Sequence, residues 1–316
     1  MRKRAGVLWR TGEYGYNMGT SPRTLLDAWQ IKAKKQLGQN FLRYPAIAEK
    51  IVGAARLLSE DTILEIGAGL GSLTIPAARK ARWVYAVETD GRITGLLKAE
   101  ILAAGLENVR ILKKDILRLD ISDLAAGAGG RFVIMGNLPY HISSQVLIRL
   151  IESRRLIHHA TLMFQKELAD RLLAPPGTKA YGRLTVMLAY CADIRRLMNI
   201  SADSFFPRPK VDSTVLGIQF KSTLDVAPED EIFFHHVIKA AFSKRRKTLK
   251  NALSGSHLEL SPRAAIAALT AAGIDPVRRA ETLTVEEFVQ LSNHLAPACR
   301  EMIAGMEKRN PRFKGR

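Results

Sequence analysis

The segment that decides the fold runs from Thr62 to Gly71 and reads TILEIGAGLG. Its first half is an apolar run of the kind buried in a parallel sheet, and its second half is a glycine-rich turn. Glycines let the chain turn tightly and bring backbone amides close to a ligand at the start of the following helix. The pattern therefore predicts the first strand, turn and helix of an open α/β sheet with a ligand site.

The spacing of the glycines narrows the class of ligand. Gly67, Gly69 and Gly71 form GxGxG after Glu65, whereas the dinucleotide fingerprint GxGxxG needs a glycine at the position of Ser72. The shorter form suits a nucleoside ligand that lacks a pyrophosphate. A nicotinamide-dependent oxidoreductase is therefore disfavoured.

Strands and helices alternate along the next hundred residues, which predicts βαβ units and a mostly parallel sheet. Two later segments, 194–201 and 211–220, read as strands without a helix between them, so we expect an antiparallel hairpin at the sheet edge. The other expected strands are 62–66, 83–89, 109–115, 131–137 and 160–165, the expected helices are 46–58, 73–81, 92–105, 143–153 and 166–174, and a Gly/Ala-rich loop is expected at 125–130.

The composition changes after residue 221, where only helical patterns follow, at 231–253, 262–273 and 284–306. We therefore expect a catalytic domain at 31–221 and a small all-helical domain at 222–305. Residues 1–30 are expected to be a mobile basic arm and residues 306–316 a disordered basic tail. Met18 is an alternative start of the chain.

The charge balance points to a polyanionic partner. Among 316 residues, 48 Lys and Arg stand against 30 Asp and Glu, a net charge of +18. Such an excess favours nucleic acid, or less often an anionic membrane surface. No run reaches the roughly 18 apolar residues of a membrane span. Cys191 and Cys299 lie far apart without metal-ligand spacing, so we expect no metal site and a reducing, cytoplasmic compartment.

Two carboxylates follow successive expected strands. Glu88 ends the second strand and can accept hydrogen bonds from ribose hydroxyls, while Asp115 ends the third and can accept from an adenine amino group. Ligands of open α/β sheets bind at the carboxyl ends of the strands. We therefore expect both residues beside the glycine turn, although each alone could be a strand-end or capping residue.

The fourth strand ends in Asn137, Leu138, Pro139 and Tyr140. The side-chain oxygen of Asn137 and a neighbouring backbone carbonyl can each accept a hydrogen from an exocyclic base amine, which orients the nitrogen lone pair. The ring of Tyr140 can stack on a nucleobase, a contact worth roughly 1–3 kcal/mol. This tip is the predicted reaction site.

The chain resembles the ribosomal RNA adenine dimethyltransferase family, and within it the bacterial small-subunit branch. The segments that carry the resemblance span about residues 34–295 and are LGQNFL (37–42), EIGAGLG (65–71), Glu88, Asp115, NLPY (137–140), FQKELADRL (164–172), KAYGRL (179–184), FFPRPKVDS (205–213) and AFSKRRKTLKNAL (241–253).

The resemblance implies a Rossmann-like methyltransferase sheet that uses S-adenosyl-L-methionine, with S-adenosyl-L-homocysteine as product and no metal. It implies dimethylation at N6 of two adjacent adenosines near the 3′ end of 16S rRNA, in small-subunit particles during ribosome biogenesis, by a cytoplasmic monomer. Phe205 matches a second aromatic that stacks on the flipped base, with Phe206 as the alternative. The implied cofactor contacts are Asn40, Leu42, Gly67, Gly69, Glu88, Asp115 and Asn137.

A basic cluster is expected to bind RNA phosphates from a helix of the C-terminal domain. Its members, without an acid among them, are Lys239, Lys244, Arg245, Arg246, Lys247 and Lys250. Two alternatives remain at this stage: a related 23S rRNA methyltransferase of the macrolide-resistance type, and a mainly non-catalytic RNA-binding factor for ribosome assembly or mitochondrial transcription. The intact NLPY tip and cofactor pattern favour the catalytic small-subunit enzyme.

Overall fold

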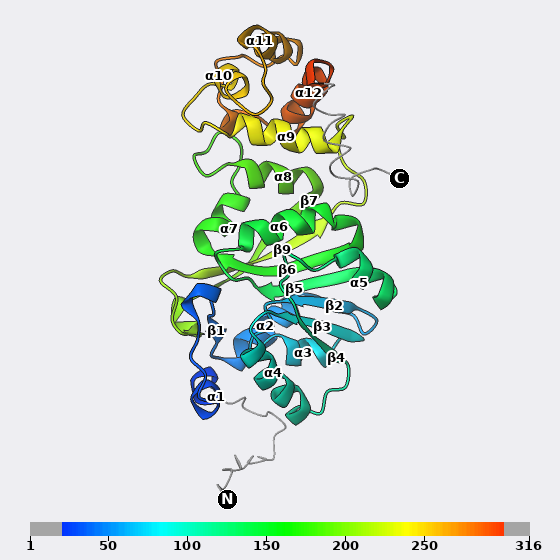
Figure 1. The fold of residues 1–316 in the computed structure, drawn as a ribbon, viewed down its shortest axis with the longest axis vertical. Helices are drawn as coiled ribbons and strands as arrows, with labels where there is room; N and C mark the ends of the chain where they lie inside the picture. Colours follow the sequence, from blue (N-terminus) through cyan, green and yellow to red (C-terminus); the bar gives the residue numbers. More distant parts are fainter. Residues whose placement is uncertain (1–20, 300–316) are drawn as a thin grey trace, which may run out of the picture.

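A seven-stranded mixed sheet forms the centre of the molecule in the computed structural model, which describes residues 21–299 (Figure 1). Its strand order is β4-β3-β2-β5-β6-β9-β7, with β9 antiparallel to both neighbours and the other pairs parallel. The strands are β2 (Thr62–Ile66), β3 (Trp83–Glu88), β4 (Val109–Lys113), β5 (Phe132–Asn137), β6 (Ile157–Gln165), β7 (Ala192–Ile200) and β9 (Ser213–Phe220). This confirms the predicted fold class, including the antiparallel pair at the sheet edge, where β9 lies between β6 and β7.

Helices cover both faces of the sheet, because alternate residues of each central strand point to opposite sides. Ile63, Val84 and Val133 pack in one apolar cluster, whereas Leu64 and Ile134 belong to another. The first face carries α2 (Pro45–Ala54), α3 (Thr74–Ala78) and α4 (Gly91–Ala103), and the second carries α5 (Ile121–Ala128), α6 (Ser143–Glu152), α7 (Lys166–Leu172) and α8 (Arg183–Cys191).

The C-terminal helices continue the apolar cluster of the second face rather than forming a detached core. The ring of Tyr190 on α8 lies 4.7 Å from that of Phe234 on α9, and Arg154 forms an ion pair with Glu231 at 2.7 Å. In Figure 1 these helices lie beyond α8, at the end of the molecule away from α1. They are α9 (Glu231–Ala241), α10 (Leu249–Ser254), α11 (Pro262–Ala271) and α12 (Val285–Leu295). The proposed domain boundary at 221 falls between β9 and α9.

Two local expectations are wrong. The expected loop at 125–130 is largely helical, because Asp120 accepts hydrogen bonds from the backbone N–H groups of Ser122 and Asp123 and starts α5, which ends at the left-handed Gly129. The helix expected over 231–253 stops at Ala241 and restarts at Leu249. Between them lie four adjacent cations, Lys244 to Lys247. There Arg245 donates to the carbonyl of Lys179, and the N–H of Leu249 at the start of α10 donates to the carbonyl of Arg278, so tertiary contacts replace the hydrogen bonds of a continuous helix.

The helix α8 (Arg183–Cys191) was not predicted.

The N-terminal region also contains more helix and strand than expected. Residues expected to belong to a mobile arm form α1 (Pro22–Ala28), which Ser21 caps by accepting from the backbone N–H of Thr24. A two-stranded sheet pairs β1 (Phe41–Leu42) with β8 (Phe205–Phe206). The remainder of the expected arm, and the basic tail, lie outside the described residues. No helix between residues 21 and 299 has the length and apolar character to cross a membrane.

A buried acid links the central sheet to α3. Glu65 on β2 is 2% exposed, and the hydroxyl of Thr74 on α3 donates to its carboxyl group at 2.5 Å. Burial raises the pKa of Glu65 to about 8, the nearby Glu88 adds to this effect, and the Thr74 hydrogen bond opposes it. Glu65 is therefore protonated in the folded protein near neutral pH.

This protonation predicts a pH-dependent stability difference between the wild type and Glu65→Gln. Above pH 4.5 the unfolded chain loses the Glu65 proton, whereas the folded protein keeps it until about pH 8. The folded state then binds more protons, so its free energy of unfolding falls as pH rises through this window, by at most about 1.4 kcal/mol per pH unit. Glutamine stays neutral and removes this contribution.

The measurement is urea unfolding of both proteins at several values between pH 5 and pH 8, a window that follows from the pKa above. Glu107→Gln, at an exposed position, is the matched control. A stability difference between wild type and Glu65→Gln that does not change with pH would contradict a protonated Glu65.

Candidate active site

One cleft at the carboxyl ends of β2, β3 and β5 gathers the residues predicted to contact the cofactor. It contains about 820 Å³ of empty space, part of it continuous with solvent. All seven predicted residues line it, namely Asn40, Leu42, Gly67, Gly69, Glu88, Asp115 and Asn137. They come from five separate segments of the chain. The parallel sheet brings four of these segments together because its strand ends share one edge, and the fifth, with Asn40 and Leu42, lies outside that sheet.

The glycine turn between β2 and α3 forms the floor of this cleft. Gly67, Gly69 and Gly71 have φ values of +76°, +55° and +86°, which other residues rarely adopt. A side chain at Gly67 would also stand 3.4 Å from the carbonyl oxygen of Asn137. The glycines therefore allow both the turn and its close contact with the tip of β5.

Glu88 is held in place by backbone amides. Its Oε1 accepts hydrogen bonds from the N–H groups of Thr89 and Asp90 at 2.8 and 2.9 Å, and its Oε2 accepts from Gly69 N–H at 3.1 Å. Burial raises the pKa of Glu88, and the three N–H donors oppose that rise. Oε2 retains a lone pair for a donor in the cleft, such as a ribose hydroxyl.

Asp115 is more open than Glu88. Its side chain is 43% exposed, and its Oδ1 accepts from the backbone N–H of Leu117 at 2.9 Å. Arg118 approaches Oδ2 at 3.9 Å from the solvent side, with its own side chain 90% exposed. Asp115 therefore turns an acceptor group toward the cleft without being locked as firmly as Glu88.

The tip of β5 has four residues with distinct surroundings. Asn137 Nδ2 donates to the carbonyl of Asn40 at 2.8 Å, and Leu138 is buried in the core. The carbonyl of Pro139 already accepts hydrogen bonds from Ile142 N–H and Ser143 Oγ. The Tyr140 hydroxyl lies 2.8 Å from Ser213 Oγ on β9, and burial raises the pKa of Tyr140, so the phenol stays neutral.

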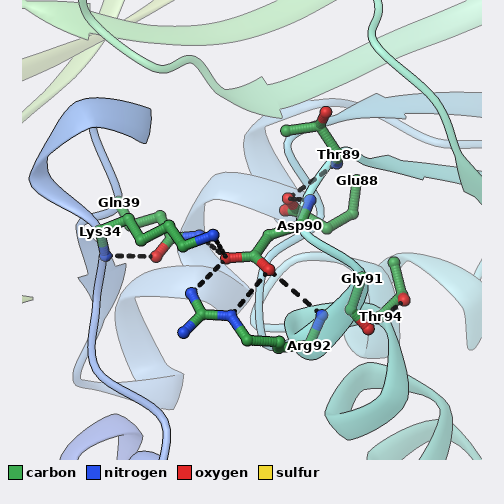
Figure 2. Close-up of polar contacts among 8 residues, drawn as sticks. All are labelled: Lys34, Gln39, Glu88, Thr89, Asp90, Gly91, Arg92 and Thr94. Carbon is green, nitrogen blue, oxygen red and sulfur yellow. Dashed lines mark hydrogen bonds and ion pairs between the residues drawn. The ribbon is translucent and has the colours of Figure 1, made fainter.

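A polar network that the sequence did not indicate lies beside the cleft and is centred on Asp90 (Figure 2). The side chain of Asp90 is 3% exposed, begins α4 as its cap, and pairs with Arg92 at 2.7 Å. Gln39 Nε2 donates to Asp90 Oδ2 at 3.2 Å, and Lys34 Nζ lies 3.7 Å from the same oxygen. An acid directly before a helical pattern is a capping signal, but its contacts with residues 34–39 have no local sequence signal.

Phe205, predicted to stack on the base, and its alternative Phe206 do not line the cleft. Phe205 is 1% exposed and packs in the apolar cluster beneath Leu42, so no ring face is available to a base in this structure. The partly buried Phe206 packs beside Phe41 and Leu26. This burial follows from the pairing of β8 with β1, which the sequence does not show.

The sequence had suggested that the basic cluster forms one face of a helix, but the structure does not place its members on one helix. Lys239 lies near the end of α9 and Lys250 on α10, while Lys244 through Lys247 occupy the exposed connection between them. The guanidinium group of Arg245 donates to the carbonyl of Lys179, which ties the connection to the segment before α8. Among residues 21–299, no group of three or more His, Cys, Asp or Glu side chains is arranged to hold a metal ion.

Known proteins resemble this chain along most of its length. A ribosomal RNA small subunit methyltransferase A of Desulforapulum autotrophicum is 49% identical over 87% of this chain and 96% of its own. The protein of the same name in Magnetococcus marinus is 42% identical, again over 87% and 96%.

Solved structures agree with this result. A dimethyladenosine transferase from Plasmodium falciparum aligns over 79% of this chain and 95% of its own, with 28% identity and a TM-score of 0.66. The 23S rRNA methyltransferase ErmE, at 24% identity and a TM-score of 0.59, covers 81% of this chain and 99% of its own and supports the fold alone. The family model for ribosomal RNA adenine dimethylase matches residues 30–297. The chain therefore belongs to the ribosomal RNA adenine dimethylase family.

Proposed function

We propose that this chain transfers methyl groups from S-adenosylmethionine to N6 of two adjacent adenosines in a loop near the 3′ end of 16S rRNA. The product is N6,N6-dimethyladenosine, and the substrate is the small-subunit particle during ribosome biogenesis, with the enzyme acting as a cytoplasmic monomer. The observation that supports this proposal most directly is that Glu88 and Asn137 line one cleft. The names of the curated relatives support the choice of the small subunit.

The cleft fits a nucleoside that carries an amino-acid chain. Glu88 Oε2 has a lone pair for a ribose hydroxyl, and the half-exposed Asp115 can accept from an adenine amino group. The turn at Gly67 and Gly69 lets the ligand approach the backbone, while Asn40 and Leu42 close the opposite side. When bound, S-adenosylmethionine supplies a methyl group already activated by its sulfonium.

The residues at the tip of β5 orient the accepting amine. Asn137 Oδ1 is the side-chain acceptor for one N6 hydrogen. Because the Pro139 carbonyl already has two donors, we assign the second hydrogen to the carbonyl of Leu138. The lone pair of the amine is then turned out of conjugation with the ring, and Tyr140 supports the base by stacking. Positioning of this kind provides most of the rate enhancement, and the methylated nitrogen releases its proton to water.

The decisive experiment incubates the protein with isotopically labelled S-adenosylmethionine and unmethylated small-subunit particles. Mass spectrometry of nuclease fragments should locate dimethylated adenosines near the 3′ end of 16S rRNA. Label confined to 23S rRNA would favour the macrolide-resistance type of enzyme. Binding to particles without any transfer would favour a non-catalytic assembly factor.

Substitution of the tip asparagine tests the chemistry. Asn137→Ala should lower kcat by about a hundredfold or more, because an oriented acceptor at the reacting amine is lost. Affinity for small-subunit RNA should change little, because phosphate contacts dominate it. Single-turnover methylation and filter binding measure the two effects separately. Near-normal transfer would remove Asn137 from the mechanism.

Neutralisation of the basic connection tests RNA binding. The triple variant with Lys244, Arg245 and Arg246 changed to Ala should bind RNA more weakly and flatten the dependence of log K on log salt by roughly 2 to 3, one unit per lost phosphate contact. The matched control changes Lys80, Arg82 and Lys98 on the opposite end of the fold to Ala. An unchanged slope in the first variant would mean that the connection does not contact phosphates.

A further inference from the structure

Residues 37–42 line the cleft, and the segment 34–42, here named the bridging segment, contacts both of its walls. On one side it meets Asp90 at the start of α4, and on the other it meets the tip of β5. At its end it pairs with β8, with Phe41 opposite Phe206 and Leu42 opposite Phe205. The bridging segment therefore contacts both Asp90 and Asn137.

Gln39 attaches the bridging segment to the first wall with both ends of its carboxamide (Figure 2). Its Nε2 donates to Asp90 Oδ2 at 3.2 Å, and its Oε1 accepts from the backbone N–H of Lys34 at 2.7 Å. The second bond closes the segment on itself, and the first fixes the closed loop to α4. Lys34 Nζ, 3.7 Å from Asp90 Oδ2, adds an ion pair.

The attachment point is rigid. Arg92 donates to Asp90 through its backbone N–H, Nε and a terminal nitrogen at 3.2, 3.1 and 2.7 Å. The Asp90 side chain is only 3% exposed. A carboxylate held by a forked guanidinium in this way keeps one orientation, so it presents Oδ2 to Gln39 in a fixed position.

The residue after Gln39 determines which way the catalytic amide faces. The carbonyl of Asn40 can only accept a hydrogen bond, so the group of Asn137 that lies 2.8 Å from it must be the nitrogen. Asn137 Oδ1 then faces away from Asn40. In the flipped orientation, Asn137 would present its NH₂ group to the N–H of an incoming amine, and two donors would oppose each other.

The bridging segment also packs closely on the same tip. A side chain at Gly38, whose φ is +62°, would stand 3.2 Å from His141 Nδ1 and 3.5 Å from the Tyr140 backbone nitrogen. The absence of a side chain at Gly38 therefore lets the bridging segment lie close to the backbone of residue 140. A displacement of Gln39 would be passed to Asn40 and to the loop that holds Tyr140.

We propose that Gln39 is a positioning residue for methyl transfer: docked on Asp90, it holds the Asn40 carbonyl where that carbonyl selects the reactive orientation of the Asn137 carboxamide. This inference rests on the proposed function for its effect on rate. The attachment of the bridging segment to Asp90 is a separate property that needs no RNA to be measured.

A pair of variants that exchanges donor and acceptor tests the attachment. Gln39→Glu keeps the acceptor for Lys34 N–H but sets a carboxylate against Asp90, and Asp90→Asn sets an NH₂ group against Gln39 Nε2. Each single change therefore breaks the hydrogen bond. The double variant restores it in the reverse direction, with Asn at 90 donating to Glu at 39, while an oxygen remains to cap α4. Because the NH₂ group of Asn at 90 cannot accept from the Arg92 terminal nitrogen, the double variant is compared with Asp90→Asn, which loses the same Arg92 hydrogen bond.

The measurements are kcat and KM for methylation of small-subunit particles, and hydrogen–deuterium exchange of the bridging segment in the protein alone. For Gln39→Glu we expect kcat to fall about tenfold with little change in KM for RNA. The reason is that the hydrogen bond from Gln39 to the Asp90 carboxylate is replaced by repulsion between two carboxylates. Exchange in residues 36–42 should accelerate. Relative to Asp90→Asn, the double variant should have a higher kcat and slower exchange in these residues. Gln290→Glu on α12, the same change at an exposed position, should match the wild type.

Three results would overturn the proposal. The first is wild-type exchange in Gln39→Glu, which would show that Asp90 does not hold the bridging segment. The second is accelerated exchange with an unchanged kcat, which would separate the attachment from the orientation of Asn137. The third is a double variant as impaired as Asp90→Asn, both in kcat and in exchange. A wild-type protein that methylates no RNA would instead refute the proposed function, while the exchange data would still report on the attachment.

Discussion

The close parallel pairing of β2 and β5 is the constraint on which the site depends. At this pair the chain reverses its direction of growth across the sheet, because β3 and β4 lie on one side and β6 on the other. Gly136 makes the approach possible, since a side chain there would stand 2.5 Å from the carbonyl oxygen of Ile66. The glycine turn and Asn137 therefore emerge side by side from adjacent strand ends, which brings the turn proposed to bind the methyl donor next to the tip proposed to hold the adenine.

Short-range hydrogen bonds and long-range charge attraction act on the two proposed ligands, the methyl donor and the RNA. Within the cleft, Glu88 and Asp115 act over hydrogen-bond distances, where backbone donors and burial control each carboxylate. Outside it, a net charge of +18 attracts a polyanion from a distance, although salt screens exposed charges beyond about 8–10 Å. The acidic cleft can therefore select a small ligand by its hydroxyl and amino donors without cancelling the attraction of the whole surface for RNA.

Much of the fold was predictable because the signals are local. The apolar runs that became β2, β3, β4 and β5 and the glycines of the turn identified the sheet and its ligand edge. Prediction failed where local propensity met a competing effect. A cap at Asp120 converted an apparent Gly/Ala loop into α5, and tertiary contacts of Arg245 and Leu249 divided one long helical pattern into α9 and α10. The burial of Phe205 followed from its pairing with Leu42, 163 positions away in the chain.

The sequence by itself determined the class of sheet and placed Gly67, Gly69, Glu88, Asp115 and Asn137 at strand ends that line the cleft, because residue type and strand position are local features. Asn40 and Leu42, which also line it, were predicted from the family resemblance. Only the tertiary structure decided how these residues are oriented. The nitrogen of Asn137 faces the carbonyl of Asn40, and Gln39 reaches Asp90 across 51 positions, through hydrogen bonds that no local pattern encodes. Such bonds form only when the packing of the sheet and its helices brings distant backbone groups within about 3 Å.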